Sequence, residues 1–138
     1  MSLIGVDFGL KRSGIAVSDE KMSYSTPVET IETVELLEYL ITLRIQEPYL
    51  NTIILGFPIS MNGDKNEMTS HVESFKEKLL AQNFIVLLMD ERRSTKRAFS
   101  QMKKLGINSK KGKKFKDELA ASLILQDYID FELNNRKE

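Results

Sequence analysis

The chain of 138 residues contains no cysteine and only one histidine. The absence of cysteine excludes disulfides and thiolate metal sites, and it fits a reducing compartment. The single histidine, His71, has no other ligand at metal-binding spacing, so a zinc site built on imidazole is not expected. Any metal that this protein holds should therefore be bound by oxygen ligands.

Long apolar runs are also missing. No stretch approaches the ~18 apolar residues that a membrane-spanning helix requires. The apolar run in the opening segment MSLIGVDFG is too short for a signal peptide, and Asp7 lies inside it. Because 41% of the residues are hydrophobic and 29% are charged, a folded chain is predicted rather than a disordered one. We expect a single soluble, cytoplasmic domain over residues 1–138, without membrane contact.

Neither sign of charge is in excess, since 20 basic side chains balance 20 acidic ones. The distribution is nevertheless uneven. From Arg92 to Lys116 there are eleven basic residues and no acid, whereas acids gather between Glu29 and Glu38. A basic block on a neutral protein indicates a face that attracts polyanions. The alternative is a solvated, lysine-rich loop that serves solubility.

The first part of the chain predicts a β-hairpin. In the segment LIGVDFG, alternation puts Leu3, Gly5 and Asp7 on one face of a strand. A tight glycine-flanked connection then leads into a second strand, GIAVSD. A third strand is expected near YSTPVETI, where Pro27 restricts it to an edge or a strand end.

The remainder alternates between helical and strand patterns. Helices are expected over about 33–46, 67–82, 94–105 and 115–134, with buried strands at TIILGFP and FIVLLMD. The segment INSKKGKK reads as a flexible basic loop before the last helix. This order predicts an α/β fold in which helices flank a mixed central sheet.

Carboxylates stand at three element ends. Asp7 ends the first strand, Asp90 and Glu91 end the last buried strand, and Asp117 is expected to open the final helix. In DELAASLILQDY, Ala120 and Ala121 share the face of Asp117 and allow a close approach to the sheet. Converging carboxylates suit a hard cation such as Mg²⁺ or Mn²⁺. Two such ions ~3.5–4 Å apart can activate a water and stabilise a leaving oxygen in phosphodiester cleavage.

Each acid also has a structural interpretation. Asp7 could simply begin a glycine-rich turn. Asp90 and Glu91 could complement a helix dipole and pair with neighbouring arginines, and Asp117 could be an ordinary first-turn acid.

Four segments together resemble the YqgF family: DFGLKRSGIAVSD, ILGFPISMNGD, DERRST and KKFKDELAASLILQDYI. Members of this family have an RNase H-like fold and are described as Holliday-junction resolvases and as nucleases of precursor 16S ribosomal RNA. The resemblance extends from Ile4 to Tyr128. Three positions depart from the family pattern: Leu10, where the family often has Thr, Ser60, where it has Asn, and Arg93, where it has Leu.

This resemblance implies a metal-dependent nuclease of structured nucleic acid. Asp7, Glu91 and Asp117 would be the catalytic metal ligands for Mg²⁺ or Mn²⁺, while Asp90 would either orient the loop of Glu91 or support the ligands without binding the metal. The implied substrate is precursor 16S ribosomal RNA, in ribosome biogenesis, or branched DNA. Residues that would contact the nucleic acid are Lys11, Arg12, Arg92, Arg93, Ser94, Thr95, Lys96, Lys110, Lys111, Lys113 and Lys114.

Two other functions remain open from the sequence. The protein could be a non-catalytic ribosome-assembly factor that keeps the fold and the basic face. It could also be a small phosphotransferase of the actin-like class, which shares the Asp-x-Gly hairpin but closes a second lobe over its nucleotide. A monomer and a homodimer are both compatible with the chain, although a symmetric junction resolvase would need two active sites.

Overall fold

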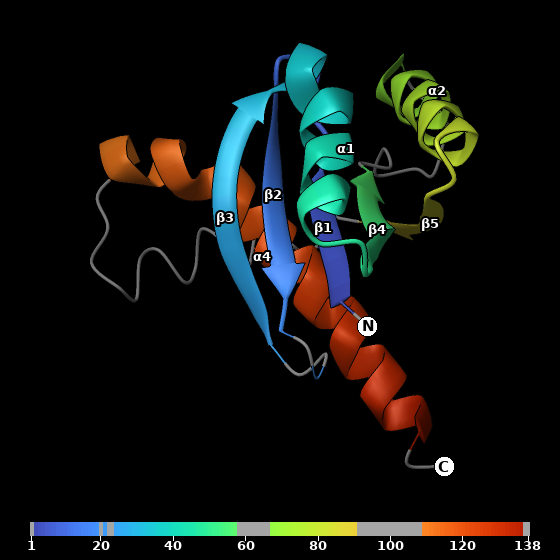
Figure 1. Cartoon of the computed structure of the whole chain (residues 1–138). Helices are drawn as coiled ribbons and strands as arrows, with labels where there is room; N and C mark the ends of the chain where they lie inside the picture. Colours follow the sequence, from blue (N-terminus) through green and yellow to red (C-terminus); the bar gives the residue numbers. More distant parts are fainter. Residues whose placement is uncertain (1, 20, 22–23, 58–66, 91–108, 137–138) are drawn as a thin grey trace.

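The computed structural model describes residues 2–19, 21, 24–57, 67–90 and 109–136 (Figure 1). Its elements follow one another as β1 (Ser2–Asp7), β2 (Arg12–Ser18), β3 (Ser25–Glu32), a 3₁₀ turn η1 (Thr33–Glu35), α1 (Leu36–Gln46), β4 (Leu50–Phe57), α2 (Glu67–Ala81), β5 (Ile85–Asp90) and α4 (Ser109–Arg136). This order confirms the predicted α/β architecture.

The five strands form one mixed sheet in the order β3-β2-β1-β4-β5. The strands β1, β2 and β3 are antiparallel neighbours, so the predicted hairpin and the edge position of the third strand are confirmed. The strands β1, β4 and β5 run parallel to one another. Parallel strands end at the same side of a sheet, so the carboxyl ends of these three strands share one edge.

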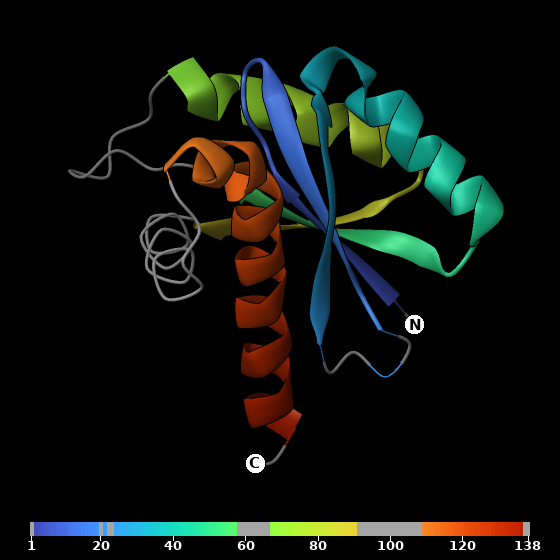
Figure 2. The same ribbon diagram turned by 90° about the vertical axis from the view of Figure 1, so that its left-hand side faces the viewer.

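Helices cover both faces of the sheet (Figures 1 and 2). On one face, Ile4, Val6 and Leu55 belong to a hydrophobic core that α1 and α2 complete. On the other face, Leu3 and Ile54 belong to a second core with α4. The predicted alternation in β1 is therefore confirmed, because successive residues of this strand enter different cores.

The helix α2 shows how the sequence pattern places a helix on the sheet. Val72, Phe75 and Leu79 are spaced by three and four residues, lie on one side of the helix and are buried. This burial confirms the helix that the sequence predicts over about 67–82. Phe75 packs its ring 5.4 Å from that of Phe8, measured between centroids, which ties the helix to the end of the first hairpin.

The structure corrects the prediction that FIVLLMD forms a buried strand. β5 is the last strand of the sheet, with no further strand on its outer side in the order observed for the described residues. Ile85 is 52% exposed, and Leu87 and Leu88 are each 38% exposed. A run of apolar residues predicts a strand equally well at the centre or at the edge of a sheet, so it did not distinguish these positions.

The start of the last helix was also predicted wrongly. The backbone is helical from Ser109, so INSKKGKK does not form a loop throughout, and Asp117 lies well inside α4 instead of opening it. Lysine is a good helix former, and Gly112 costs a helix only about 1 kcal/mol relative to alanine. The glycine and the charge were overweighted as loop signals. In the described part of the chain, no helix is long and apolar enough to cross a bilayer.

Candidate functional site

The candidate site is built on the sheet edge at which β1, β4 and β5 end. Asp7 is paired in register with Gly56 of β4, and Asp90 of β5 is paired with Phe57. Both acidic residues therefore end their strands at the same edge, with β4 between them. Neighbouring strands are about 4.8 Å apart, so the backbones of Asp7 and Asp90 are separated by roughly twice that spacing.

Asp7 belongs to the side of the sheet that α4 covers. Leu3, two pleats earlier in β1, packs in the same core as Ala121 and Leu125 of α4. Alternation therefore assigns Asp7 to the α4 side, where its side chain is partly buried. Asp90 follows Met89, which packs against the α4 core, so the register position of Asp90 belongs to the opposite side.

α4 approaches β1 closely at Gly5. A Cβ atom at Gly5 would lie 2.8 Å from the Cβ of Leu125 and 2.9 Å from the carbonyl oxygen of Ala121. Ala120 and Ala121 are buried, as predicted from their place on the face of Asp117. Because Gly5 of β1 and Ala121 of α4 are both small, the helix backbone can pack directly against the strand.

The direction of α4 relative to β1 determines on which side of this contact Asp117 and Asp7 lie. α4 begins at the end of the molecule where the carboxyl ends of β1 and β4 lie and runs back toward the start of β1 (Figures 1 and 2). Asp7 lies two residues beyond Gly5, about 6.6 Å along the strand. Asp117 lies four residues before Ala121, about 6 Å along the helix. Both steps lead toward the end of the molecule where α4 begins.

The structure describes the other predicted site residues to different extents. Lys11 and Arg12 are exposed at the turn between β1 and β2, next to the edge that carries Asp7. The backbone of α4 includes four predicted nucleic-acid contacts, Lys110, Lys111, Lys113 and Lys114. The side chain of Asp117 lies outside the described part, as do all atoms of Glu91, Arg92, Arg93, Ser94, Thr95 and Lys96.

The side chains that the structure does describe include no group of three or more His, Cys, Asp and Glu placed to hold a metal ion. Of the predicted metal ligands, only the Asp7 side chain is among them. Carboxylate ligands at this edge have the right chemistry for Mg²⁺ or Mn²⁺, which prefer oxygen donors. Asp7 is thus the one candidate metal ligand whose side chain the structure describes.

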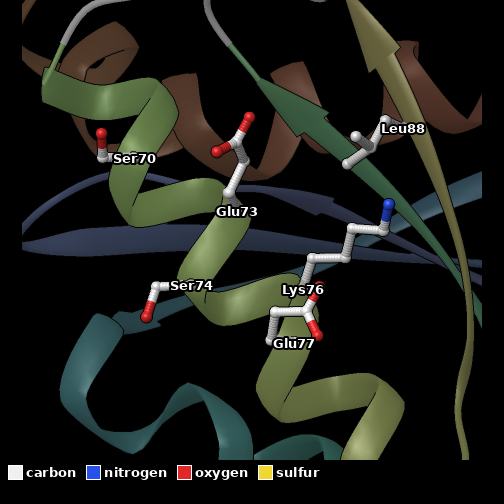
Figure 3. A pocket seen from close by; sticks show the side chains of 6 residues that line it. All are labelled: Ser70, Glu73, Ser74, Lys76, Glu77 and Leu88. Carbon is white, nitrogen blue, oxygen red and sulfur yellow. The ribbon is translucent and has the colours of Figure 1, made fainter.

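A hollow of about 450 Å³ lies on the other side of the sheet, between α2 and β5 (Figure 3). It is lined by Ser70, Glu73, Ser74, Lys76, Glu77 and Leu88. Leu88 alternates with Met89 along β5 and therefore lies on the α2 side, away from the Asp7 side. This hollow is consequently separate from the acidic edge, the sheet edge at which Asp7 and Asp90 end their strands.

The sequence analysis missed two hydroxyl residues near the acidic edge, Ser13 and Thr33. The Ser13 Oγ and Thr33 Oγ1 atoms are 2.8 Å apart and bind the turn that carries Lys11 and Arg12. The two residues are 20 positions apart in the chain. Their contact follows from the register in which β2 pairs with β3, and the exact register of two strands cannot be read from one sequence.

The fold is that of nucleases that resolve branched DNA. A fowlpox virus resolvase, whose structure includes its substrate Holliday junction DNA, matches 96% of this chain and 99% of its own with a TM-score of 0.57 at 15% identity. Thermus thermophilus RuvC in complex with a Holliday junction substrate matches 96% of each chain with a TM-score of 0.56 at 13% identity. At these identities the likeness establishes the fold alone, which is the predicted RNase H-like α/β fold.

The sequence comparisons identify the family. Residues 1–131 match the RuvX family, described as Holliday junction resolvase. A protein from Ruminiclostridium cellulolyticum, named "Putative pre-16S rRNA nuclease", is 36% identical over 143 residues, which cover 99% of each chain. The chain therefore belongs to the RuvX family, the YqgF family of the sequence analysis. Its enzyme class is that of nucleases, which hydrolyse phosphodiester bonds.

Proposed function

We propose that this protein is a metal-dependent nuclease that processes precursor 16S ribosomal RNA in the cytoplasm, acting as a single domain of residues 1–138. The name of the Ruminiclostridium cellulolyticum relative supports the substrate, since the two chains align over nearly their whole length. The observation that carries the proposal is the position of Asp7 at the shared end of the parallel strands, on the side covered by α4.

In this proposal Asp7, Glu91 and Asp117 bind Mg²⁺ or Mn²⁺. Bound divalent ions would supply an activated water and charge stabilisation at the leaving oxygen. The place of Asp117 in α4, four residues before the contact between Ala121 and Gly5, supports its inclusion in the set. The strand register supports Glu91 over Asp90, because Asp90 belongs to the side of the sheet opposite Asp7. Asp90 would then support the loop that carries Glu91.

The basic residues would hold the phosphate backbone beside this site. Lys11 lies in the turn after β1, Arg12 begins β2, and the backbone of the first turns of α4 carries further lysines on the helix that includes Asp117. Contacts of this kind fix the position of a nucleic acid without reading its sequence. The remaining predicted contacts, Arg92, Arg93, Ser94, Thr95 and Lys96, follow Glu91 directly in the chain.

The test is cleavage by purified wild type, Asp7→Asn and Asp117→Asn proteins, with Mn²⁺ or Mg²⁺ and with a chelator. Each protein is offered end-labelled precursor 16S ribosomal RNA and a four-way DNA junction. We expect cleavage of the RNA that is lost with chelator and falls at least about a hundredfold in both variants, because a lost metal ligand removes several kcal/mol of transition-state stabilisation.

Asp130→Asn is the matched control, since this exposed acid lies on the same helix and, in the described part of the chain, accepts a hydrogen bond from Gln126 at 3.0 Å. It should cleave as wild type does. Cleavage of the four-way junction instead of the RNA would favour the second candidate, a junction resolvase, which the family description supports. Binding without any cleavage would contradict both and leave a non-catalytic assembly factor.

A further inference from the structure

Gly9 lies in the turn between β1 and β2, and both of its backbone polar groups bind hydroxyl side chains. Its N–H donates to Ser13 Oγ at 3.3 Å. Its carbonyl accepts from Thr33 Oγ1 at 2.6 Å. The two hydroxyl oxygens are themselves 2.8 Å apart. These three contacts form a closed ring that begins and ends at Gly9.

The direction of the hydrogen bonds in this ring is determined. A hydroxyl has one hydrogen, and Thr33 must donate its own to the Gly9 carbonyl, which can only accept. Ser13 therefore donates to Thr33 Oγ1, and Ser13 Oγ accepts from the Gly9 N–H. Each hydroxyl both donates and accepts, an arrangement in which the bonds strengthen one another.

Two further contacts tighten the turn. The backbone N–H of Thr33 donates to the Lys11 carbonyl at 2.9 Å, so Thr33 holds the turn at two points. A Cβ atom at Gly9 would lie 2.3 Å from the carbonyl oxygen of Arg12, so only glycine fits here. Leu10 is 52% exposed and offers no hydroxyl, so Ser13 and Thr33 are the side chains that bind this turn in the described structure.

Alternation along β2 connects this ring to the acidic edge. Ser13 is fully buried and shares its side of the sheet with Ile15, in the core under α1. Arg12 alternates to the other side together with Ala16, in the core under α4. That is the side of Asp7, whose register partner in β2 is Gly14. A ring that fixes Ser13 on one side of β2 thereby fixes Arg12 on the side that carries Asp7.

We propose that Ser13 and Thr33 are positioning residues that hold Lys11 and Arg12 in place to bind nucleic-acid phosphate beside Asp7. This inference rests on the proposed nuclease function and adds two residues to it. The hydroxyls do not touch the substrate; they preorganise the turn, so that no conformational freedom has to be lost when the nucleic acid binds.

The principal variant is Thr33→Val, which removes the hydroxyl and keeps the branched shape. Thr33→Ser keeps the hydroxyl and should restore wild-type behaviour. Thr42→Val is the matched control, because Thr42 is at an exposed position of α1 and its hydroxyl donates to the Glu38 carbonyl at 2.9 Å. Ser13→Ala breaks the ring at a second point and replaces Thr33→Val if that variant does not fold.

The measurements are the dissociation constant for precursor 16S ribosomal RNA and the KM and kcat of its cleavage. We expect Thr33→Val to raise the dissociation constant and KM about three- to tenfold, with a smaller change in kcat, because phosphate contacts fix position more than they take part in the chemistry. Unchanged binding and KM in both Thr33→Val and Ser13→Ala would overturn the inference.

A double-mutant cycle separates positioning from general stability. Arg12→Ala should weaken binding by a smaller factor in the Thr33→Val background than in wild type, because the arginine is already displaced there. Equal factors in the two backgrounds would show independent residues and overturn the inference while leaving the nuclease proposal intact. Faster hydrogen exchange of the Gly9 amide in Thr33→Val is the expected independent signature of the opened ring. A wild type that binds no nucleic acid would overturn both proposals.

Discussion

Gly5 is the residue at which β1 and α4 come closest. We expect Gly5→Ala to destabilise the protein by about 1–3 kcal/mol, because the new methyl group meets the Cβ of Leu125 at 2.8 Å and the Ala121 carbonyl oxygen at 2.9 Å. Denaturant unfolding measures this loss. Adding Leu125→Ala should not restore stability, since a Cβ atom and a backbone oxygen remain in the way. Recovery in the double variant would mean that the helix can move instead.

Tyr39 should make the stability of the protein sensitive to alkali. Burial and the hydrogen bond to the Glu29 carboxylate, with O–O distance 3.1 Å, raise the pKa of Tyr39 from 10.0 to about 12. The folded protein thus retains the phenol proton more strongly than the unfolded chain does. This contribution to stability is fully present below pH 10 and is lost as the pH rises toward 12.

The measurement for Tyr39 is the unfolding free energy between pH 9 and 12, compared with that of Tyr39→Phe. The wild type should lose stability relative to the variant across this window. Parallel curves for the two proteins would contradict the assignment. Glu29→Gln is the second comparison, because it removes the charge that disfavours tyrosinate and should narrow the window.

At the scale of elements, α4 is fastened to β3 by a small polar cluster. Ser25 Oγ donates to the Ser122 carbonyl at 2.6 Å, and the Ser25 N–H donates to the Gln126 side chain at 3.0 Å. Ser25→Ala should lower the free energy of unfolding by about 1 kcal/mol, the usual net worth of a hydrogen bond. The denaturant midpoint should fall with an unchanged slope. The control is Ser74→Ala, at an exposed position of α2, which should leave the denaturant midpoint unchanged.

The prediction of elements succeeded wherever one face of an element is apolar. The spacing of Val72, Phe75 and Leu79 is that of a helix with one buried face, and α2, which was expected over about 67–82, has that face in the structure. β5 was interpreted wrongly because its apolar residues are alike on both faces, a pattern that does not report the position of a strand in the sheet. The first turns of α4 were missed because lysines and a glycine carry no apolar period.

At the scale of the whole molecule, a net charge of zero conceals a basic block with eleven positive residues between Arg92 and Lys116. The logarithm of the binding constant for nucleic acid should therefore fall linearly with the logarithm of the salt concentration. The slope should be about 0.9 per phosphate contact for duplex DNA and about 0.7 for single strands. Titrations of wild type and Asp7→Asn between 50 and 200 mM salt measure the slope. The two proteins should share it, since Asp7 is proposed to bind metal and not phosphate. A slope near zero would contradict polyanion binding by this block.

The fold class, the family and the identity of the candidate acids can be read from the amino-acid sequence without a structure. These depend on local patterns and motifs: alternation in β1, the three-and-four spacing of α2, and the segments that carry Asp7, Glu91 and Asp117. The register of the strands was decided only by the tertiary structure, and that register assigns Asp7 to the side of α4 and Asp90 to the other.

The close approach of α4 at Gly5 and the hydroxyl ring around Gly9 also appear only in the folded chain. The contact at Gly5 joins residues 5 and 121, and the ring joins residues 9 and 33. Such contacts form because packing and hydrogen bonding bring distant segments together, and a local pattern holds no record of its distant partner. The candidate acids were therefore readable from the sequence, whereas the place of Asp7 at the shared strand edge and the hydroxyl ring near it required the structure.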